Sequence, residues 1–285
     1  MDKKAFDRIF YRGTDLWPQL IDKTIFITGN TGFYGSWFFD FLIELSALFN
    51  NKIYVFGGSR KNGFDIEQTY TFPNQLRKAD YIINCAGNSQ NADSAHYLGV
   101  ANLLNLTSGK ILHFSSGVVS YKTNTKYENV KTLGESLFHY TNQKYAIVRP
   151  FATVGPGMGL DKHFAISTFI SQKLENKQLE VLDELIIRSF CYIEDLIIQC
   201  LYIMILGKGI YEVGSDDPIS IRQAANLISD NVKIVKRDFK TNSNSNYYVA
   251  DLFRIKKEFN LSLDYDSESA IINTLNYYVH NPTRV

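Results

Sequence analysis

Residues 24–39 read TIFITGNTGFYGSWFF, a β-rich apolar run followed by three spaced glycines and an apolar stretch at helical spacing. Gly29, Gly32 and Gly35 fall where the expected strand ends and the expected helix begins. Glycine permits a tight turn and close backbone approach, and the free N–H groups of a helix N-terminus bind phosphate oxygens. The stretch therefore predicts a strand–turn–helix unit that binds the pyrophosphate of a dinucleotide. Its G-x-x-G-x-x-G spacing departs from the usual G-x-G-x-x-G, and the alternative is a merely structural turn.

The same alternation of strand-like and helix-like segments continues to about Pro150. The strand-like runs are TIFITG, KIYVFGG, DYIINCAG, KILHFSSG and KYAIVRP. Apolar strands joined by helical crossovers imply a parallel sheet covered on both faces, so we expect a doubly wound α/β (Rossmann) fold with a smaller C-terminal substrate-binding α/β domain. Because few residues separate the second run from Asp80, we expect the third strand of that fold to be vestigial. The expected parts are an N-terminal extension at 1–22, a dinucleotide-binding domain at 23–154 and 189–214, and a substrate domain at 155–188 and 215–285.

Composition excludes several classes of protein. The 285 residues carry a formal net charge of +1 with both signs interspersed, so no strong field attracts nucleic acid or an anionic membrane. Cys85, Cys191 and Cys200 lie far apart in apolar surroundings, unlike a disulfide framework or a metal site. The longest apolar stretch is shorter than the roughly 20 residues of a membrane span, and the first residues lack a secretion signal. We expect a cytoplasmic protein with no metal.

The residues after the second strand bear on the choice of cofactor. A carboxylate there would bind the ribose 2′-hydroxyl of NAD, whereas an arginine suits the 2′-phosphate of NADP. The strand ends in Gly57 and Gly58, followed by Ser59 and Arg60, with no acid. Arginine forms paired charge-assisted bonds to phosphate, and serine can donate another, so the sequence favours NADP(H). NAD(H) remains possible, with Arg60 then a solvated loop residue.

The segment SSGVVSYKTNTKYENVK, residues 115–131, contains the candidate acid/base. Tyrosine has an ordinary pKa of about 10 and needs a nearby cation to favour its phenolate. Tyr127 and Lys131 are four residues apart on an expected helix and so share one face, whereas Tyr121 has Thr125 at that offset. Tyr127 is therefore the predicted acid/base. The two serines end a strand at the carboxyl edge, where a hydroxyl can stabilise developing charge.

With these motifs the chain resembles the extended short-chain dehydrogenase/reductase family, in particular its nucleotide-sugar branch of epimerases and dehydratases, from Lys23 to about Tyr278. The motifs that carry the resemblance are TGNTGFYG, DYIINCAG, SSGVVSY, VRPFATVGPG and IIRSFCYIEDLI. The resemblance implies a catalytic set of Ser116, Tyr127 and Lys131. The residues implied to bind the cofactor are Gly29, Thr31, Gly32, Phe33, Tyr34, Gly35, Ser59, Arg60, Asp65, Ile66, Ala86, Gly87, Lys131 and Pro150. Those implied to bind the substrate are Ser89, Gly117, Val118 and Arg188, although Arg188 fits a surface ion pair as well.

Three departures from the family pattern bear on function. His96 stands where the family usually has an asparagine, which leaves a proton relay there open. Ala152 replaces an asparagine that often contacts the substrate. Gly117 and Val118 occupy the places of an acidic pair found in 4,6-dehydratases, so we do not expect dehydration.

The leading hypothesis is an NADP(H)-dependent reductase of a nucleotide-linked 4-keto-deoxysugar, with Tyr127 as general acid. The alternative is an NAD-dependent nucleotide-sugar 4-epimerase, which needs the same three catalytic residues. A non-catalytic dinucleotide-binding regulator is a third hypothesis, against which the paired Tyr127 and Lys131 count. The resemblance also implies a homodimer formed through helices within residues 92–104 and 127–140, and a role in polysaccharide biosynthesis.

Overall fold

The computed structural model describes residues 1–87, 94–122, 125–160, 164–235 and 246–281. The chain divides into two compact units. The first comprises Met1–Arg149 and Ile197–Tyr211, and the second comprises Pro150–Leu196 and Glu212–Val285.

A six-stranded sheet with the order β10-β5-β4-β3-β1-β2 forms the centre of the first unit. Its strands are β1 (Thr24–Thr28), β2 (Tyr54–Gly58), β3 (Tyr81–Asn84), β4 (Lys110–Phe114), β5 (Tyr145–Pro150) and β10 (Gly209–Val213). The pairings of β2 with β1, β1 with β3, β3 with β4 and β4 with β5 are parallel. No strand forms between Gly58 and Tyr81, a segment described throughout, which confirms the expected loss of the third strand.

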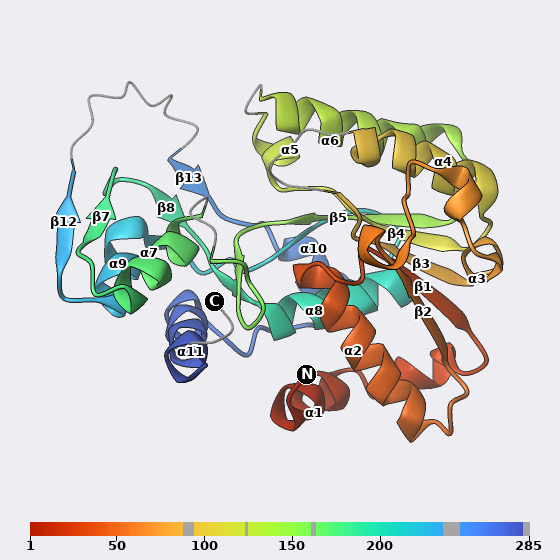
Figure 1. The fold of residues 1–285 in the computed structure, drawn as a ribbon, viewed down its shortest axis with the longest axis horizontal. Helices are drawn as coiled ribbons and strands as arrows, with labels where there is room; N and C mark the ends of the chain where they lie inside the picture. Colours follow the sequence, from red (N-terminus) through yellow and green to blue (C-terminus); the bar gives the residue numbers. More distant parts are fainter. Residues whose placement is uncertain (88–93, 123–124, 161–163, 236–245, 282–285) are drawn as a thin grey trace. The chain divides into compact units, whose positions relative to one another are not determined.

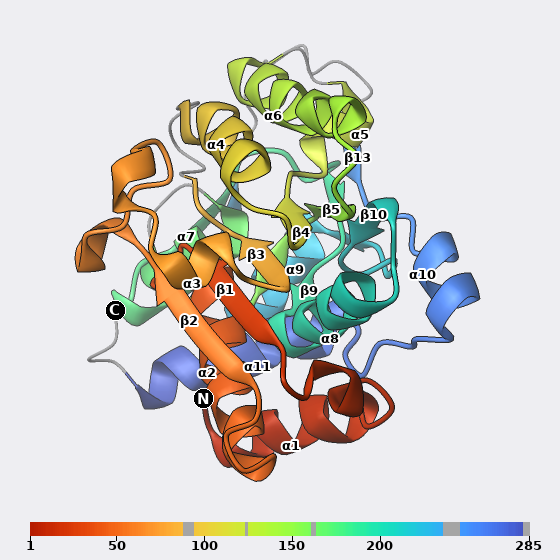
Figure 2. The same ribbon diagram turned by 90° about the vertical axis from the view of Figure 1, so that its right-hand side faces the viewer.

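Helices cover both faces of this sheet, as the sequence predicts. The helices α4 (Leu98–Leu106) and α6 (Lys126–Leu137) lie on one face, and α2 (Phe33–Leu48) and α8 (Ile193–Ile205) lie on the other (Figures 1 and 2). The middle of β1 is fully buried at Ile25 and Ile27, which explains why that strand reads as an unbroken apolar run. The predicted doubly wound fold is confirmed.

Shorter helical segments precede β1 or connect the strands of the first unit. They are α1 (Lys3–Arg12), η1 (Trp17–Leu20), η2 (Arg60–Asn62), η3 (Thr69–Thr71), α3 (Asn74–Arg77), η4 (Ser94–His96), α5 (Val118–Tyr121) and η5 (Phe138–Tyr140). The N-terminal α1 packs on α2 through Phe6, whose ring centroid lies 5.3 Å from that of Phe41. The first 22 residues thus share the apolar core of the first unit.

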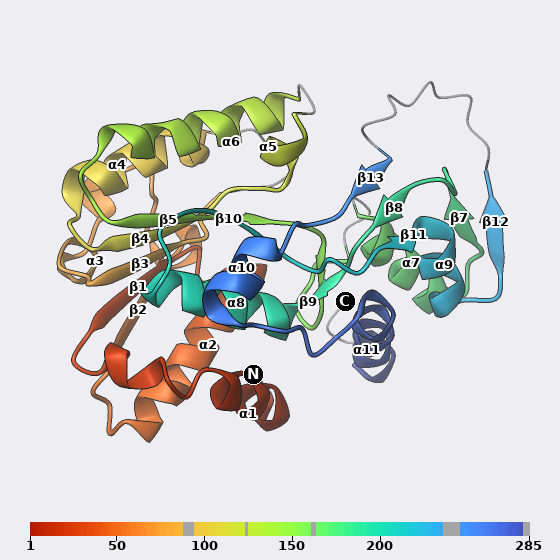
Figure 3. The ribbon, with the colours of Figure 1, turned by 180° about the vertical axis from the view of Figure 1, so that it is seen from behind.

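The second unit contains three small sheets and four helices of its own in the part of the chain that the structure describes. The sheets are β11 (Ile219–Ser220) with β8 (Ile187–Arg188) and β13 (Tyr247–Tyr248), β12 (Val232–Ile234) with β7 (Leu179–Val181), and β6 (Thr153–Val154) with β9 (Cys191–Tyr192). The helices are α7 (Ala165–Leu174), α9 (Ile221–Ile228), α10 (Phe253–Phe259) and α11 (Ser267–His280). Figure 3 shows α7 and α9 beside the β7–β12 pair.

Two kinds of feature are absent from the described residues. No helix among them is long and apolar enough to cross a membrane. No group of three or more histidine, cysteine, aspartate or glutamate side chains among them could hold a metal ion.

Candidate active site

The glycine loop joins β1 to α2 with the geometry that a diphosphate requires. Gly29 has a φ of +70°, which a residue with a side chain rarely adopts, and Gly32 is the N-cap of α2. A Cβ atom on Gly35 would lie 2.2 Å from the carbonyl oxygen of Gly29, so the first turn of α2 sits against the loop backbone. The residues present therefore fit a dinucleotide whose pyrophosphate meets the N-terminus of α2. Thr31, Phe33 and Tyr34 belong to this loop and first turn.

The segment after β2 holds Arg60 between two carboxylates. Its Nη2 donates to Oε1 of Glu67 at 3.3 Å, and its Nε lies 3.8 Å from Oδ2 of Asp65. Sequence reasoning missed Glu67, because seven residues separate it from Arg60 and only the folded loop brings them together. The Arg60 side chain is nevertheless 65% exposed. This segment thus presents one exposed guanidinium beside two carboxylates.

Two other residues predicted near the adenosine are buried. Ser59 donates its backbone N–H to Oδ1 of Asn62 at 2.7 Å. The Ile66 side chain belongs to the apolar core and fills the space beside Gly99 on α4. The Ile66 carbonyl oxygen accepts a hydrogen bond from Asn102 Nδ2 at 3.0 Å.

Tyr127 and Lys131 come together on α6. The helix begins after Thr125, whose hydroxyl accepts the N–H of Glu128 at 3.1 Å. Lys131 is buried, its Nζ lies 5.8 Å from the centroid of the Tyr127 ring, and it donates to the carbonyl oxygen of Phe114 at 2.9 Å. An ammonium fixed in this way favours the charged form of a neighbouring phenol. The spacing of four residues predicted this contact correctly.

Ser116 lies two residues beyond the Phe114 carbonyl that Lys131 binds, at the end of β4. The residue is buried, and the Val118 N–H approaches its Oγ at 3.4 Å. Gly117 is the N-cap of α5 and Val118 is its first residue. The end of β4 therefore carries the predicted serine at the same edge of the sheet as the Lys131 ammonium.

His96 lies between Gly87, in the turn after β3, and Tyr127. Its ring is buried and meets the Tyr127 ring edge to face, with centroids 5.8 Å apart and planes at 81°. Gly87 has a φ of +140°, and a Cβ on it would lie 2.2 Å from Cε1 of His96. The ring thus contacts the turn after β3 and the Tyr127 ring, so the departure from the family asparagine lies beside the predicted acid/base.

A buried polar network crosses three strands beneath the site. Thr28 Oγ1 accepts the Ala86 N–H at 3.3 Å and donates to Asn84 Oδ1 at 2.7 Å, while Asn84 Nδ2 donates to His113 Nδ1 at 3.1 Å. His113 therefore carries its proton on Nε2. Burial, with smaller contributions from Lys131 and His96, lowers the pKa of His113 well below its usual range. The neutral imidazole leaves Lys131 as the nearby cation, and sequence reasoning missed this network because its members lie on separate strands.

The other predicted residues divide between the units. Pro150 ends β5 and is the first residue of the second unit, and Arg188 lies within that unit. The Arg188 Nη1 donates to the carbonyl oxygen of Ile187 at 2.8 Å, and its guanidinium lies 5.5 Å from the centroid of Tyr248. Ser89 lies outside the described residues.

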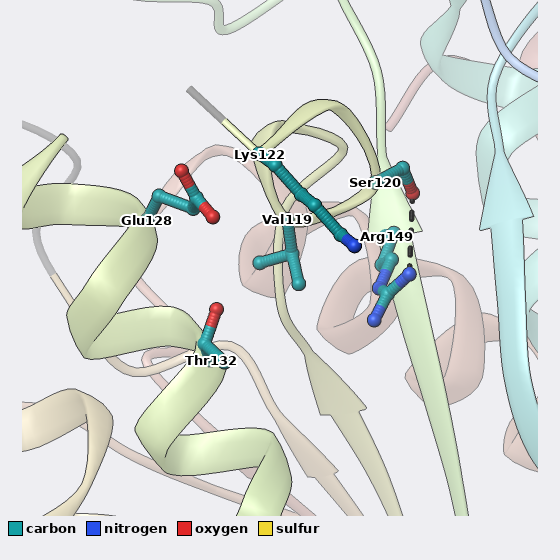
Figure 4. A pocket seen from close by; sticks show the side chains of 6 residues that line it. All are labelled: Val119, Ser120, Lys122, Glu128, Thr132 and Arg149. Carbon is teal, nitrogen blue, oxygen red and sulfur yellow. Dashed lines mark hydrogen bonds between the residues drawn. The ribbon is translucent and has the colours of Figure 1, made fainter. Parts of the chain in front are cut away.

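A pocket of about 430 Å³ lies beside α6 in the first unit (Figure 4). It is lined by residues from α5 and its C-cap, from α6 and from β5, namely Val119, Ser120, Lys122, Glu128, Thr132 and Arg149.

Comparisons with known proteins agree with this geometry. The NAD dependent epimerase/dehydratase family matches residues 25–214. No curated protein matches the chain. A UDP-glucose 4-epimerase from Thermotoga maritima, solved with UDP-glucose, has a TM-score of 0.76 and 17% identity over 90% of this chain and 99% of that chain. A dTDP-glucose 4,6-dehydratase from Bacillus anthracis, in complex with NAD, has a TM-score of 0.74 and 18% identity over 91% and 97%.

A third solved structure is RMD from Pseudomonas aeruginosa complexed with NADPH, with a TM-score of 0.72 and 19% identity over 91% of this chain and 99% of that chain. At these identities the likeness establishes the fold, and it is the family match over most of the chain that establishes kinship. That match, with a glycine loop at the end of β1 and a tyrosine and lysine one turn apart on α6, confirms the resemblance seen in the sequence: the chain belongs to the NAD dependent epimerase/dehydratase family.

Proposed function

We propose that the chain is an NADP(H)-dependent reductase of a nucleotide-linked 4-keto-deoxysugar. The observation that carries this proposal is the Tyr127 ring beside the Lys131 ammonium, which the Phe114 carbonyl holds in place. When bound, the nicotinamide supplies hydride chemistry at a carbonyl carbon. Tyr127 donates a proton to the oxygen as negative charge builds on it, and Ser116 orients that oxygen through its hydroxyl. The glycine loop between β1 and α2 holds the cofactor diphosphate.

Arg60 supports the choice of NADP(H). Its ion pairs with Asp65 and Glu67 are those of a largely exposed side chain, and exposed pairs of this kind contribute only about 0–1 kcal/mol. A 2′-phosphate offers several oxygens to the planar guanidinium and can displace such weak partners. The RMD from Pseudomonas aeruginosa, which has a similar fold, was solved in complex with NADPH.

The same two carboxylates favour a second candidate function, an NAD(H)-dependent nucleotide-sugar 4-epimerase. Asp65 and Glu67 repel a 2′-phosphate and can accept a hydrogen bond from a 2′-hydroxyl. An epimerase needs the same Tyr127, Lys131 and Ser116. The UDP-glucose 4-epimerase from Thermotoga maritima has this fold.

One experiment distinguishes the two reactions. The purified chain is incubated with NADPH or NADH and a panel of nucleoside-diphosphate 4-keto-deoxysugars, and cofactor absorbance is followed together with the sugar products. A reductase oxidises about one NADPH per sugar, and Arg60→Gln raises the KM for NADPH about tenfold by removing the charge that binds the phosphate. Lys61→Gln, which removes the adjacent charge, is the matched control. Copurified NAD(H) with sugar turnover and no net absorbance change would establish the epimerase instead.

A further inference from the structure

A bidentate ion pair lies beneath the helix that carries Tyr127. The Arg149 Nε donates to Glu135 Oε1 at 2.9 Å, and the Arg149 Nη2 donates to Glu135 Oε2 at 2.6 Å. The side chains are 20% and 6% exposed, respectively. Two parallel charge-assisted bonds fix the relative orientation of both side chains as well as their separation. The pair is therefore a geometric constraint between α6 and β5.

The same two side chains also bind β4 and α5. The Ser115 hydroxyl donates to Glu135 Oε1, and the Arg149 Nη1 donates to the Ser120 hydroxyl at 3.2 Å (Figure 4). Glu135 thus joins α6 to the end of β4, and Arg149 joins β5 to α5. Both serines flank the segment that contains Ser116.

The position of Glu135 on α6 relates this network to the catalytic residues. Glu135 follows Lys131 by four residues and Tyr127 by eight, so the three side chains lie along one stripe of the helix. Lys131 binds the carbonyl of Phe114 while Glu135 binds the hydroxyl of the next residue, Ser115. Two successive turns of α6 are therefore attached to Phe114, the last residue of β4, and to Ser115, which follows it.

Few apolar side chains of α6 are buried. Its buried residues are Glu128, Lys131, Gly134 and Glu135, and Leu137 in its last turn packs partly against the apolar core. At Gly134 the helix backbone approaches the loop before α4 so closely that a Cβ would lie 2.3 Å from the His96 carbonyl oxygen. Because apolar burial is non-directional, we expect the charge-assisted bonds of the buried polar side chains to determine how the helix is turned.

We propose that Glu135 and Arg149 are positioning residues that fix the rotation of α6, and so place Tyr127 and Lys131 against the reacting oxygen. Neither residue belongs to the Ser116, Tyr127 and Lys131 set. The proposal rests on the proposed function for its turnover assay, and a second measurement without substrate tests it independently.

The test replaces the pair with uncharged side chains of similar length, as Glu135→Met with Arg149→Met. Exchanging both partners of a buried pair for apolar groups commonly preserves stability, whereas removing one leaves an unpaired charge. We expect a folded enzyme whose kcat is about 10- to 100-fold lower, because small displacements of reacting groups have effects of this size. The KM values for NADPH and the sugar should change by less than about threefold. Arg254→Met with Glu258→Met, which removes an exposed pair on α10, is the matched control and should leave kcat unchanged.

Hydrogen exchange followed by mass spectrometry supplies the measurement without substrate. Amides of residues 126–137 should exchange faster in the double variant, while those of α2 keep their wild-type rates. A wild-type kcat in the folded double variant overturns the proposal. If the wild type turns over no nucleotide sugar, the proposed function fails. In that case the positioning role is judged by hydrogen exchange alone: it is overturned if α6 exchanges at the same rate in the double variant as in the wild type. Should the double variant unfold, Arg149→Lys, which keeps the charge but loses the fork, must lower kcat at least about threefold or the proposal is wrong.

Discussion

The chemistry assigned to Tyr127 depends on one neighbour. Tyr127 has an ammonium group on the next turn of its helix, whereas Tyr121 ends α5 and is followed at the same offset by Thr125. The ammonium is buried and bonded to the Phe114 carbonyl, so it remains close to the phenol. This distinguishes a phenol that can exchange a proton from one that only packs.

Replacing Tyr127 with phenylalanine should separate binding from turnover. Tyr127→Phe removes the hydroxyl and keeps the ring that meets His96. We expect an unchanged dissociation constant for the cofactor, measured by fluorescence titration, and a fall in kcat of about 10²–10⁴-fold, the usual contribution of general acid catalysis. Tyr121→Phe is the control and should keep its turnover. Full activity in Tyr127→Phe would mean that another group supplies the proton.

The buried imidazole of His113 should make the fold sensitive to mild acid. Its pKa is lowered, mainly by burial, so the folded state binds this proton more weakly than the unfolded state does. The free energy of unfolding therefore falls as the pH drops below the ordinary histidine pKa of about 6.5, with a slope from this group of at most about 1.4 kcal/mol per pH unit. Above that pH the contribution is complete.

His113→Gln tests this pH dependence, because an amide stays neutral throughout the range. Urea unfolding at pH 7, 6 and 5 should show a wild type that is more stable than the variant at pH 7 and loses that advantage towards pH 5. The exposed His139, replaced in the same way, should leave the wild-type dependence intact. A constant difference between wild type and His113→Gln at all three values would contradict the account.

At the scale of elements, α2 and α6 are held by opposite means. The buried residues of α2 include Trp37, Phe38, Phe41, Leu42 and Leu45, so apolar burial fixes this helix on the sheet. The buried residues of α6 are polar or glycine, and specific bonds fix it instead. Apolar burial thus holds α2, which follows the glycine loop, whereas directional hydrogen bonds and an ion pair hold α6, which carries Tyr127.

A side chain at Gly35 should weaken cofactor binding while leaving most of the fold intact. In Gly35→Ala the new Cβ would meet the Gly29 carbonyl at 2.2 Å, so the loop and the first turn of α2 must separate. That separation removes the N–H groups from the diphosphate. Titration with NADPH or NADH should show at least a tenfold weaker affinity, about 1.4 kcal/mol. Ser36→Ala, one residue further on, is the control, and wild-type affinity in Gly35→Ala would argue against a diphosphate site.

At the scale of the whole molecule, α4 and α6 carry exposed apolar side chains. Leu98 and Leu133 are 40% and 47% exposed on these two adjacent helices, and Tyr97 beside them is 39% exposed. Exposed apolar side chains on neighbouring helices often form the contact between subunits in helical interfaces.

We predict a homodimer formed through this face. Sedimentation equilibrium should give about twice the chain mass of 32.6 kDa, and Leu133→Glu should give the mass of one chain, because a charge buried in the interface lacks a partner. Leu48→Glu, at the exposed end of α2, should still dimerise. A wild type that sediments as one chain at all concentrations would rule out this interface.

The sequence by itself determined the features that depend on neighbours along the chain. The β1–α2 glycine loop follows from glycines placed between an apolar strand and a helix, and the Tyr127–Lys131 contact follows from the four-residue helical repeat. The parallel sheet follows from apolar runs such as residues 25–27 within β1, because a strand buried on both faces has no polar side.

Only the tertiary structure decided which distant side chains meet. Glu67 forms an ion pair with Arg60 because the loop between them folds back. The His96 ring contacts the Tyr127 ring, and Glu135 on α6 forms an ion pair with Arg149 on β5. No period of helix or strand relates such residues, since their separation is set by how the elements pack. The contacts of Arg60 affect which cofactor we expect, and those around α6 affect the orientation of Tyr127. The local sequence pattern instead indicates the fold and the class of chemistry.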